Sequence, residues 1–404
     1  MQLAKNQPEY KTAVIGGGAA GIVAAISCKR SGNPVVLCEK TSQIGKKILA
    51  SGNGRCNLLN EDFDSKYYNQ AARKLVTGIY SQFGKAQILS FFKGLGLGTF
   101  SKEGRIFPVT NQASSVLKVL EMELKKLSVA VEYGFKCMAV NTSKTVFNVV
   151  SESRKTIVSR NVILTGGGKS YPSYGSDGSI YEIARQLGHT IVEPVPSVVP
   201  LIVKDKLCYT LQGQRISARA KSQVNGKVGQ EVEGELLFTK YGLSGTCILD
   251  VSEDISIAIN REHKTNVHVV VDLVPFMSRE QLKSELDNRK KLKFPVEDRL
   301  VGILPNKIAV ALKDLFLDGN NDVAVENLKN QRFPVAGTRG WNEAEFTSGG
   351  VKVDEINPKT LESKLHNGLY FAGEVLDVNG KRGGYNLGWA WASGDIAGQT
   401  MPAG

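Results

Sequence analysis

The segment VIGGGAAG, Val14 to Gly21, is the part of the sequence from which the fold is most directly inferred. Its glycines match G-x-G-x-x-G, and they follow a short apolar run and precede an alanine- and isoleucine-rich helical pattern. Gly16 permits a tight turn, Gly18 lets the backbone approach a pyrophosphate, and Gly21 allows close helix packing. The helix N-terminus would stabilise the phosphate charge. The expected contacts from this turn are Gly16, Gly18, Ala19, Ala20 and Gly21.

A second strand follows the helix and completes a βαβ unit. Residues 11–15 and 35–38 predict buried strands, and residues 21–30 predict the helix between them. Such a unit implies a parallel sheet covered by helices. Glu39 ends the second strand and can accept hydrogen bonds from a ribose, which favours FAD or NAD over a 2′-phosphorylated cofactor. We include the adjacent Lys40 in the predicted cofactor site.

Length and composition are typical of a soluble globular protein with two or three structural units. The chain has 404 residues, of which 42% are hydrophobic and 22% charged. No run of about 18 apolar residues occurs, so we expect a cytoplasmic enzyme without a membrane span. The six cysteines form no CxxC pair and the four histidines lack metal-ligand spacing, which predicts reduced thiols and no metal site. The sequence does not indicate the oligomeric state.

The positive charge of the chain is concentrated in its N-terminal part. The net charge is +12, and residues 1–190 carry 25 lysines and arginines against 12 acidic residues. A basic field of this kind attracts anionic dinucleotides, and it also attracts nucleic acid. Because no RNA-binding motif accompanies it, we expect a small-molecule substrate, with nucleic acid as the less favoured partner.

Three more glycine-rich segments favour a flavin over a plain NAD-dependent dehydrogenase, which would need no further cofactor loops. They are ILTGGG at 163–168, LYFAGEVLDVNG at 369–380 and GGYNLGWAWASG at 383–394. The carboxylate of Glu374 can bind ribityl hydroxyls. The free amides of Asn386 and Leu387 at a helix N-terminus can stabilise negative charge near flavin N1 and C2=O. The expected contacts are Thr165, Gly166, Gly167, Gly373, Glu374, Gly384, Tyr385, Asn386 and Leu387.

The loop SGNGRCN, Ser51 to Asn57, admits several interpretations. A metal site is disfavoured because Cys56 has no ligand partners at suitable spacing. A nucleophilic cysteine stays open, since Arg55 would lower a thiol pKa, although no histidine lies nearby in sequence. We interpret the loop as lying along the FAD pyrophosphate and ribityl chain, and a purely structural loop is the alternative. The expected contacts here are Lys47, Gly54, Arg55, Cys56 and Asn57.

The middle of the chain differs in character from both ends. Residues 191–275 include the proline-rich PVPSVVP, which starts at Pro194, and continue in short strand-like runs, which predicts an inserted β-barrel-like domain. Residues 276–330 are rich in Lys, Glu, Leu and Asp at helical spacing, which predicts a small helical insert. Glycine-rich loops return after that. We therefore predict an α/β, Rossmann-like FAD-binding domain formed by residues 1–190 and 331–404.

The motifs together resemble the BaiN-like, or YhiN-like, family of FAD-dependent oxidoreductases, in order and over essentially the whole chain. The segments that carry the resemblance are VIGGGAAG, SGNGRCN, ILTGGGKSYPSYGSDG, GELLFTKYGLSG, GTRGWNEAEFTSGGV and GLYFAGEVLDVNGKRGGYNLGWAWASG. The resemblance implies FAD bound by the first and last segments, with a β-barrel-like insert and a helical unit between them. The sequence departs from the family pattern at Asn53, Lys240 and Thr246, where a glycine, a histidine and a proline are usual.

The predicted function is that of an FAD-dependent oxidoreductase. The family includes NAD(P)H-linked members, and one named activity reduces a conjugated double bond in a steroid-like bile-acid intermediate. We expect hydride to pass from NAD(P)H through FAD to an organic acceptor, and we assign no catalytic residue. No second G-x-G-x-x-G unit is evident, so NAD(P)H would dock transiently in the same cleft. The alternatives are a flavoprotein that acts on RNA and a redox sensor with Cys56 as its reporter.

Overall fold

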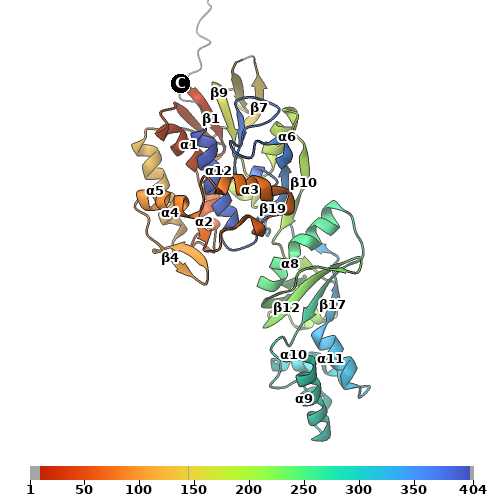
Figure 1. Ribbon diagram of the computed structural model, residues 1–404. Helices are drawn as coiled ribbons and strands as arrows, with labels where there is room; N and C mark the ends of the chain where they lie inside the picture. Colours follow the sequence, from red (N-terminus) through yellow and green to blue (C-terminus); the bar gives the residue numbers. More distant parts are fainter. Residues whose placement is uncertain (1–9, 144, 401–404) are drawn as a thin grey trace, which may run out of the picture. The chain divides into compact units, whose positions relative to one another are not determined.

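The computed structural model describes residues 10–143 and 145–400, and the chain divides into two compact units (Figure 1). Unit 1 comprises Met1–Pro194 and Phe346–Gly404, and unit 2 comprises Val195–Glu345. The chain leaves unit 1 through β10 (Ile191–Ser197) and returns through β19 (Phe346–Val351). The bounds expected for the inserts from the sequence are 191 and 330, whereas unit 2 runs from Val195 to Glu345.

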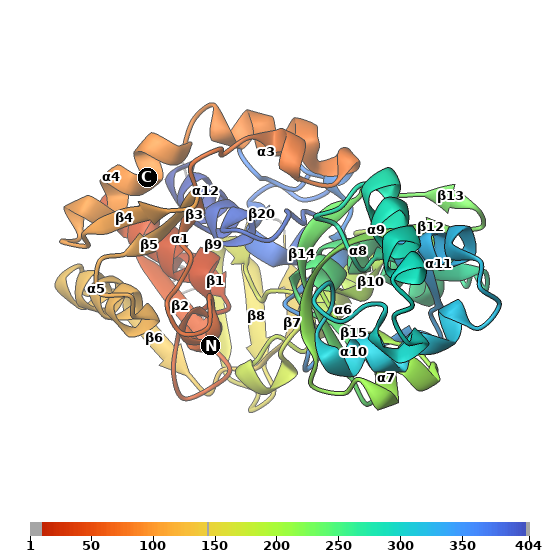
Figure 2. The same ribbon diagram turned by 90° about the horizontal axis from the view of Figure 1, so that it is seen from below.

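Unit 1 is built on a seven-stranded sheet in the order β6-β2-β1-β9-β8-β7, with β20 also paired to β9. The strands are β1 (Tyr10–Ile15), β2 (Val35–Glu39), β6 (Ala130–Tyr133), β7 (Cys137–Thr142), β8 (Phe147–Ser151), β9 (Thr156–Leu164) and β20 (Leu369–Phe371). In the parallel part Val14 lies opposite Leu37 and Ile163, and Figure 2 shows β1 between β2 and β9. These three residues are fully buried, because helices cover the parallel strands.

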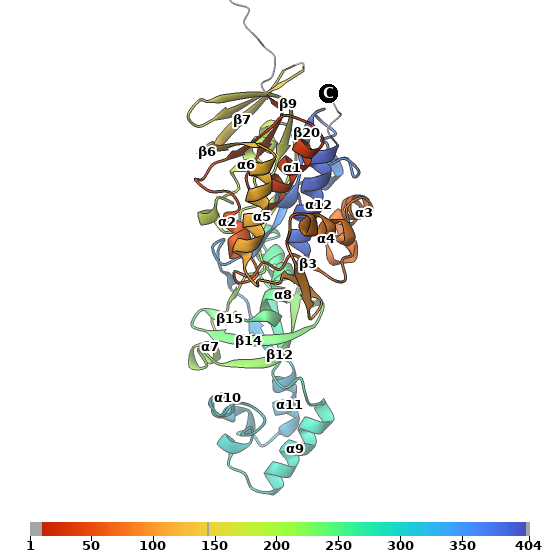
Figure 3. The ribbon, with the colours of Figure 1, turned by 90° about the vertical axis from the view of Figure 1, so that its left-hand side faces the viewer.

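Two helices from opposite ends of the chain pack against each other in unit 1. They are α1 (Ala19–Arg30) and α12 (Tyr385–Gln399), which lie side by side in Figure 3. A Cβ atom at Gly394 would lie 2.4 Å from the carbonyl oxygen of Ala20, so only glycine permits this approach.

The predicted α/β, Rossmann-like fold class is confirmed. The remaining helices of the unit are α2 (Lys46–Ala50), α3 (Arg73–Tyr80), α4 (Lys85–Gly94), α5 (Ala113–Lys126) and α6 (Ser179–Gln186).

A small three-stranded sheet completes the N-terminal part of unit 1. Its order is β3-β5-β4, with β3 (Leu59–Asn60), β4 (Thr99–Lys102) and β5 (Arg105–Pro108). It follows the SGNGRCN loop directly, so β3 fixes where that loop ends.

Unit 2 is an antiparallel sheet in the order β17-β16-β12-β14-β15-β11-β18, with β13 also paired to β12. The strands are β11 (Leu201–Ile202), β12 (Arg215–Val224), β13 (Lys227–Val228), β14 (Val232–Thr239), β15 (Gly242–Ser244), β16 (Val267–Asp272), β17 (Gln331–Pro334) and β18 (Gly337–Thr338). Because β17 pairs with β16 and β18 with β11, residues 331–345 belong to unit 2, although the sequence assigned them to the predicted FAD-binding domain. Strand pairing of this kind is non-local, so the glycines of GTRGW gave no sign of it.

The helical residues 276–330 share a core with this sheet. Helices α9 (Arg279–Lys291), α10 (Asn306–Ala311) and α11 (Asn321–Lys329) contribute buried side chains to one cluster with the strands and α8 (Thr246–Ser256).

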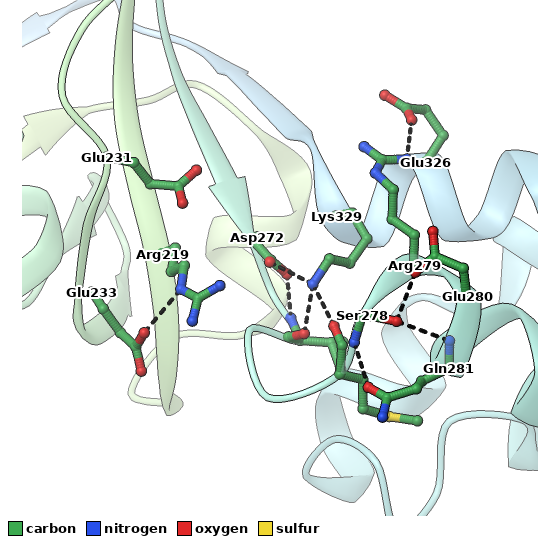
Figure 4. Close-up of polar contacts among 12 residues, drawn as sticks. Arg219, Glu231, Glu233, Asp272, Ser278, Arg279, Glu280, Gln281, Glu326 and Lys329 are labelled. Atoms are coloured by element: carbon green, nitrogen blue, oxygen red, sulfur yellow. Dashed lines mark hydrogen bonds and ion pairs between the residues drawn. The ribbon is translucent and has the colours of Figure 1, made fainter.

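An ion pair fastens the end of α11 to the end of β16 (Figure 4). Lys329 Nζ lies 2.6 Å from Asp272 Oδ2 and donates to the carbonyl oxygens of Val274 and Met277. Both charged side chains are about nine-tenths buried, so the helical part and the sheet form a single unit.

Candidate functional site

An open cavity with about 750 Å³ of empty space lies in unit 1 at the carboxyl ends of β1, β2 and β9. This edge of a parallel sheet is the usual place for ligands in α/β folds. Eight residues of the predicted cofactor site line it: Gly16, Gly18, Glu39, Lys40, Lys47, Thr165, Gly166 and Gly167.

Glycine is needed at the positions of the β1-α1 turn for different physical reasons. Gly16 has a φ of +111°, and a Cβ there would lie 2.6 Å from the carbonyl oxygen of Thr165. A Cβ at Gly21 would lie 1.9 Å from the carbonyl oxygen of Gly16. At Gly18, by contrast, an ideal Cβ meets no heavy atom within 4 Å, although the residue lines the cavity. The fold itself requires glycine at Gly16 and Gly21, whereas at Gly18 the protein leaves room for a Cβ atom beside the cavity.

Glu39 is held rigidly at the cavity wall. Its Oε2 accepts a hydrogen bond of 2.8 Å from the amide of Gly17, and its Oε1 accepts one of 2.7 Å from the amide of Thr41. Since a carboxylate oxygen can accept more than one hydrogen bond, both oxygens keep capacity for the hydroxyls of a ribose.

The opposite wall of the cavity includes two hydroxyl groups, those of Thr165 and Ser176, which differ in their hydrogen bonds. Thr165 Oγ1 lies 2.9 Å from the carbonyl oxygen of Ile15 and 2.8 Å from that of Gly16, and it shares its single proton between them, which ties the TGGG turn to β1. A Cβ at Gly167 would lie 3.0 Å from Ser176 Oγ. Ser176 lines the cavity, is 6% exposed, and its Oγ has no hydrogen-bond partner among the described residues. Buried polar atoms are nearly always paired, so this hydroxyl fits a ligand that offers an acceptor.

A charged network joins four separate segments beside the cavity. Lys47 Nζ on α2 lies 2.5 Å from Glu374 Oε2 and donates to Ser170 Oγ at 2.7 Å. Glu374 Oε1 accepts from Ser170 Oγ at 3.2 Å and from the amide of Thr347 at 2.9 Å. Glu374 is therefore fixed beside Lys47, a residue that lines the cavity.

Asn57 holds the start of α12 rather than extending into the cavity. In the orientation that satisfies both ends of its side-chain amide, its Oδ1 accepts from the amide of Gly384 at 3.2 Å. Its Nδ2 donates to the carbonyl oxygens of Leu59 and Ile106 at 3.0 and 3.3 Å. All hydrogen-bonding groups of the side chain are thus engaged with backbone, which makes Asn57 a positioning residue.

The side chains of Tyr385 and Asn386 are likewise occupied by the protein. Asn386 accepts from the amide of Gly380 at 2.8 Å and donates to its carbonyl oxygen at 2.9 Å. Tyr385 donates to the carbonyl oxygen of Asp62, and burial raises the pKa of its phenol. Neither these two residues nor Gly384 and Leu387 are in the lining of the cavity. Gly373, just before Glu374, is fixed by Ser393 Oγ, which accepts from its amide.

The SGNGRCN loop shows no arrangement for nucleophilic chemistry. Cys56 is completely buried, and this burial raises the pKa of its thiol to about 12. Arg55 is exposed, its Nε donates to the carbonyl oxygen of Gly52, and its guanidinium lies 5.3 Å from the ring centroid of Phe107. Neither residue lines the cavity, and neither does Gly54. The structure therefore speaks against Cys56 as a nucleophile or a redox reporter.

A family model described as the HI0933-like protein Rossmann domain matches residues 10–400. The chain belongs to this family. The predicted resemblance to BaiN-like and YhiN-like proteins is thereby confirmed.

Relatives of this HI0933-like protein include enzymes with two different names. It is 38% identical to a 3-dehydro-bile acid delta(4,6)-reductase of Clostridium scindens, over 96% of this chain and 98% of the relative. It is 30% identical to a ribosomal RNA dihydrouridine synthase of Haemophilus influenzae, over 94% and 95%. A flavocytochrome c3 fumarate reductase shares the fold at 16% identity and a TM-score of 0.52, covering 97% of this chain and 78% of that one.

The described residues of this HI0933-like chain contain neither a helix fit to span a membrane nor a cluster of metal-binding side chains. Across 10–143 and 145–400, no helix is long and apolar enough to cross a membrane. In the same ranges, no group of three or more His, Cys, Asp or Glu side chains is placed to hold a metal ion.

Sequence reasoning assigned no role to several residues that build the site of this HI0933-like chain. Gly17 and Thr41 orient Glu39, and Ser170 and Thr347 orient Glu374. Ser176 contributes the unpaired hydroxyl. Ser170, Ser176 and Thr347 lie inside motifs that carried the family resemblance, so the signal was present, but only the fold shows what they touch.

Proposed function

We propose that the chain is an FAD-dependent oxidoreductase that adds two hydrogen atoms to a C=C bond conjugated with a carbonyl group. The observation that carries the proposal is the 38% identity, over nearly the whole chain, to a reductase of such a bond. The cavity supports it, because its glycine turn, fixed glutamate and unpaired hydroxyl fit a dinucleotide.

The two named relatives share one chemical requirement. A 3-dehydro bile acid with double bonds at positions 4 and 6 has those bonds conjugated with its 3-oxo group. Uridine has its C5=C6 bond conjugated with the C4 carbonyl. In either compound a hydride would add to the carbon at the far end of the conjugated system, and a proton would complete the saturated bond. FAD, when bound, supplies the hydride transfer.

Different residues of unit 1 would bind different parts of the cofactor. The β1-α1 turn, with Gly18 facing open space, and the N-terminus of α1 would bind the pyrophosphate. Glu39 would accept from the adenosine ribose, and Glu374, held by Lys47, would accept from ribityl hydroxyls. The amides at the start of α12 would stabilise negative charge at the flavin N1 and C2=O. Because Asn57 fixes Gly384, it would set the position of these amides.

NAD(P)H is the proposed electron donor. The chain contains a single G-x-G-x-x-G turn, so the nicotinamide cofactor would bind transiently where the acceptor later binds. Anaerobic mixing of the yellow protein with NADH and, separately, with NADPH tests this step. Bleaching of the flavin by at least one of them is expected, and failure of both would exclude NAD(P)H as donor.

Uridine in RNA is the second candidate acceptor. The 30% identity to a ribosomal RNA dihydrouridine synthase and the surplus of basic residues in 1–190 favour it. Binding of RNA through lysines and arginines would weaken steeply with added salt, whereas binding of a steroid-like enone would not.

The oxidative half-reaction distinguishes the two acceptors. The flavin is photoreduced without oxygen and mixed with a 3-oxo-4,6-diene steroid or with unmodified ribosomal RNA. Rapid reoxidation by the steroid supports a small-molecule reductase, and reoxidation by the RNA with formation of dihydrouridine supports RNA modification. If neither oxidises the flavin faster than buffer does, the proposed reduction of a conjugated C=C bond is wrong.

A further inference from the structure

A short segment forms part of the lining of the cofactor cavity. Residues 171–179, which we call the strap, connect the TGGG turn to α6, and four of them line the cavity: Tyr174, Gly175, Ser176 and Ser179. The strap rests on the residues that follow β2. A Cβ at Gly175 would lie 3.3 Å from Thr41 Cγ2 and 3.4 Å from Lys40 Cε. The strap thus bridges the wall that contains Glu39 and the wall that contains Gly167.

An ion pair fastens the strap to the end of β2. Lys40 Nζ lies 2.7 Å from Asp177 Oδ1, and the same oxygen accepts from the hydroxyl and amide of Ser179 at 2.7 and 3.0 Å. Burial opposes ionisation of Asp177, but hydrogen bonds from Lys40 and Ser179 outweigh it and lower its pKa to about 2. The carboxylate of Asp177 is therefore ionised at neutral pH.

The strap also carries the unpaired hydroxyl of the site. Ser176 Oγ is buried, lies beside Gly167 and lines the cavity without a protein partner among the residues described. A donor in this position is left for a ligand. The side chains of Asp177 and Ser179 are engaged with each other, and Asp177 is also paired with Lys40, so the hydroxyl proton of Ser176 is the donor that this part of the strap leaves for a ligand.

We propose that the strap closes over FAD, with Ser176 donating a hydrogen bond to the cofactor and the Lys40–Asp177 pair acting as a clasp that opens when FAD enters or leaves. This inference rests on the proposed binding of FAD in the cavity. It gives Lys40 a different role from the direct cofactor contact predicted from the sequence.

The substitution Ser176→Ala tests the proposed hydrogen bond from the Ser176 hydroxyl to FAD. Loss of one neutral hydrogen bond should weaken FAD binding about five- to tenfold, measured by flavin fluorescence during titration of the apoprotein. Thermal unfolding of the apoprotein should not change, because the hydroxyl has no partner to lose. Ser197→Ala is the matched control, since Ser197 Oγ is also buried and has no hydrogen-bond partner in the described part of the chain, but it does not line the cavity. Its FAD affinity should equal that of the wild type.

The clasp is tested by the rate at which FAD dissociates. Lys40→Met and Asp177→Asn should each raise this rate about two- to fivefold, the range that a partly exposed ion pair contributes. Lys40→Arg keeps the charge and should retain the slow rate. Added salt should accelerate release from the wild type and leave the Asp177→Asn rate unchanged. Lys155→Met, which removes an exposed pair with Glu132 outside the cavity lining, is the control.

The outcomes separate this inference from the function on which it rests. If wild-type apoprotein binds no FAD, the proposed function fails. If it binds FAD but Ser176→Ala and Asp177→Asn bind and release it as the wild type does, the cofactor assignment stands and the strap is wrong. Equal acceleration by Lys155→Met would also overturn the clasp, because the effect would then reflect net charge alone.

Discussion

Two lysine–carboxylate pairs, one in each unit, have similar chemistry and different surroundings. In unit 2, Lys329 and Asp272 are 9% and 10% exposed, and Lys329 also donates to two carbonyl oxygens. In unit 1, Lys47 and Glu374 are 30% and 22% exposed, and Lys47 faces the cavity. The first pair is closed on all sides by protein, whereas the second borders space for a ligand.

The difference separates a structural ion pair from a functional one. A buried charge must have partners in the protein, and removal of one partner leaves the other charge uncompensated. A pair beside a cavity retains access to water in the absence of ligand, so its contribution to stability is small. We therefore expect changes in unit 2 to affect folding and changes beside the cavity to affect FAD.

The largest expected effect is that of Lys329→Met. Asp272 would remain buried and charged without its partner, which should lower the free energy of unfolding by about 3–5 kcal/mol. Urea denaturation followed by circular dichroism measures the loss. FAD affinity should stay unchanged in the folded fraction. The double variant Lys329→Met/Asp272→Asn should lose less than the single one, and an equal or greater loss would contradict the role of the unpaired charge.

The second prediction concerns Asp395, a buried carboxylate whose expected effect on the free energy of unfolding is smaller than that of Lys329→Met. Asp395 on α12 is 2% exposed and accepts hydrogen bonds from Ser27 and Gln399, and its burial raises its pKa to about 6. Because the folded state holds this proton more tightly than the unfolded state, stability should fall as pH rises from about 4 to about 6, by about 1–3 kcal/mol in total. The measurement is the unfolding free energy of wild type minus that of Asp395→Asn across this range. A difference that stays constant with pH would exclude the raised pKa.

The smallest effect on folding is expected from Lys47→Met. Because the pair is partly exposed, the free energy of unfolding should change by less than about 1 kcal/mol. The FAD dissociation constant should nevertheless rise about tenfold, because Glu374 loses a charge-assisted contact that orients it. Titration of the apoprotein with FAD measures this. An unchanged dissociation constant together with a large loss of stability would reverse the distinction between the two pairs.

The local parts of the fold and site were predictable from the sequence, and the non-local parts were not. The turn from Gly16 to Gly21 is specified by residues adjacent in the chain, so its pattern was enough to predict β1, α1, β2 and the place of Glu39. Lys47 and Glu374 stand 327 residues apart, and no local pattern indicates their contact. For the same reason Asn57 was interpreted as a cofactor contact, although its partner is the backbone at Gly384.

The proposed binding of FAD in this cavity is tested most directly at Gly18. The protein leaves room for a side chain there, but a bound dinucleotide would not. Its φ of −83° suits any residue, and its Cβ direction is open. Gly94, at the exposed end of α4, also has open space and is the matched control.

FAD binding to the apoproteins of Gly18→Leu and Gly94→Leu is the decisive measurement. We predict that both variants unfold at temperatures close to that of the wild type, that Gly94→Leu binds FAD normally, and that Gly18→Leu loses binding by at least about a hundredfold. Wild-type affinity in a folded Gly18→Leu variant would contradict the assignment of this cavity to FAD.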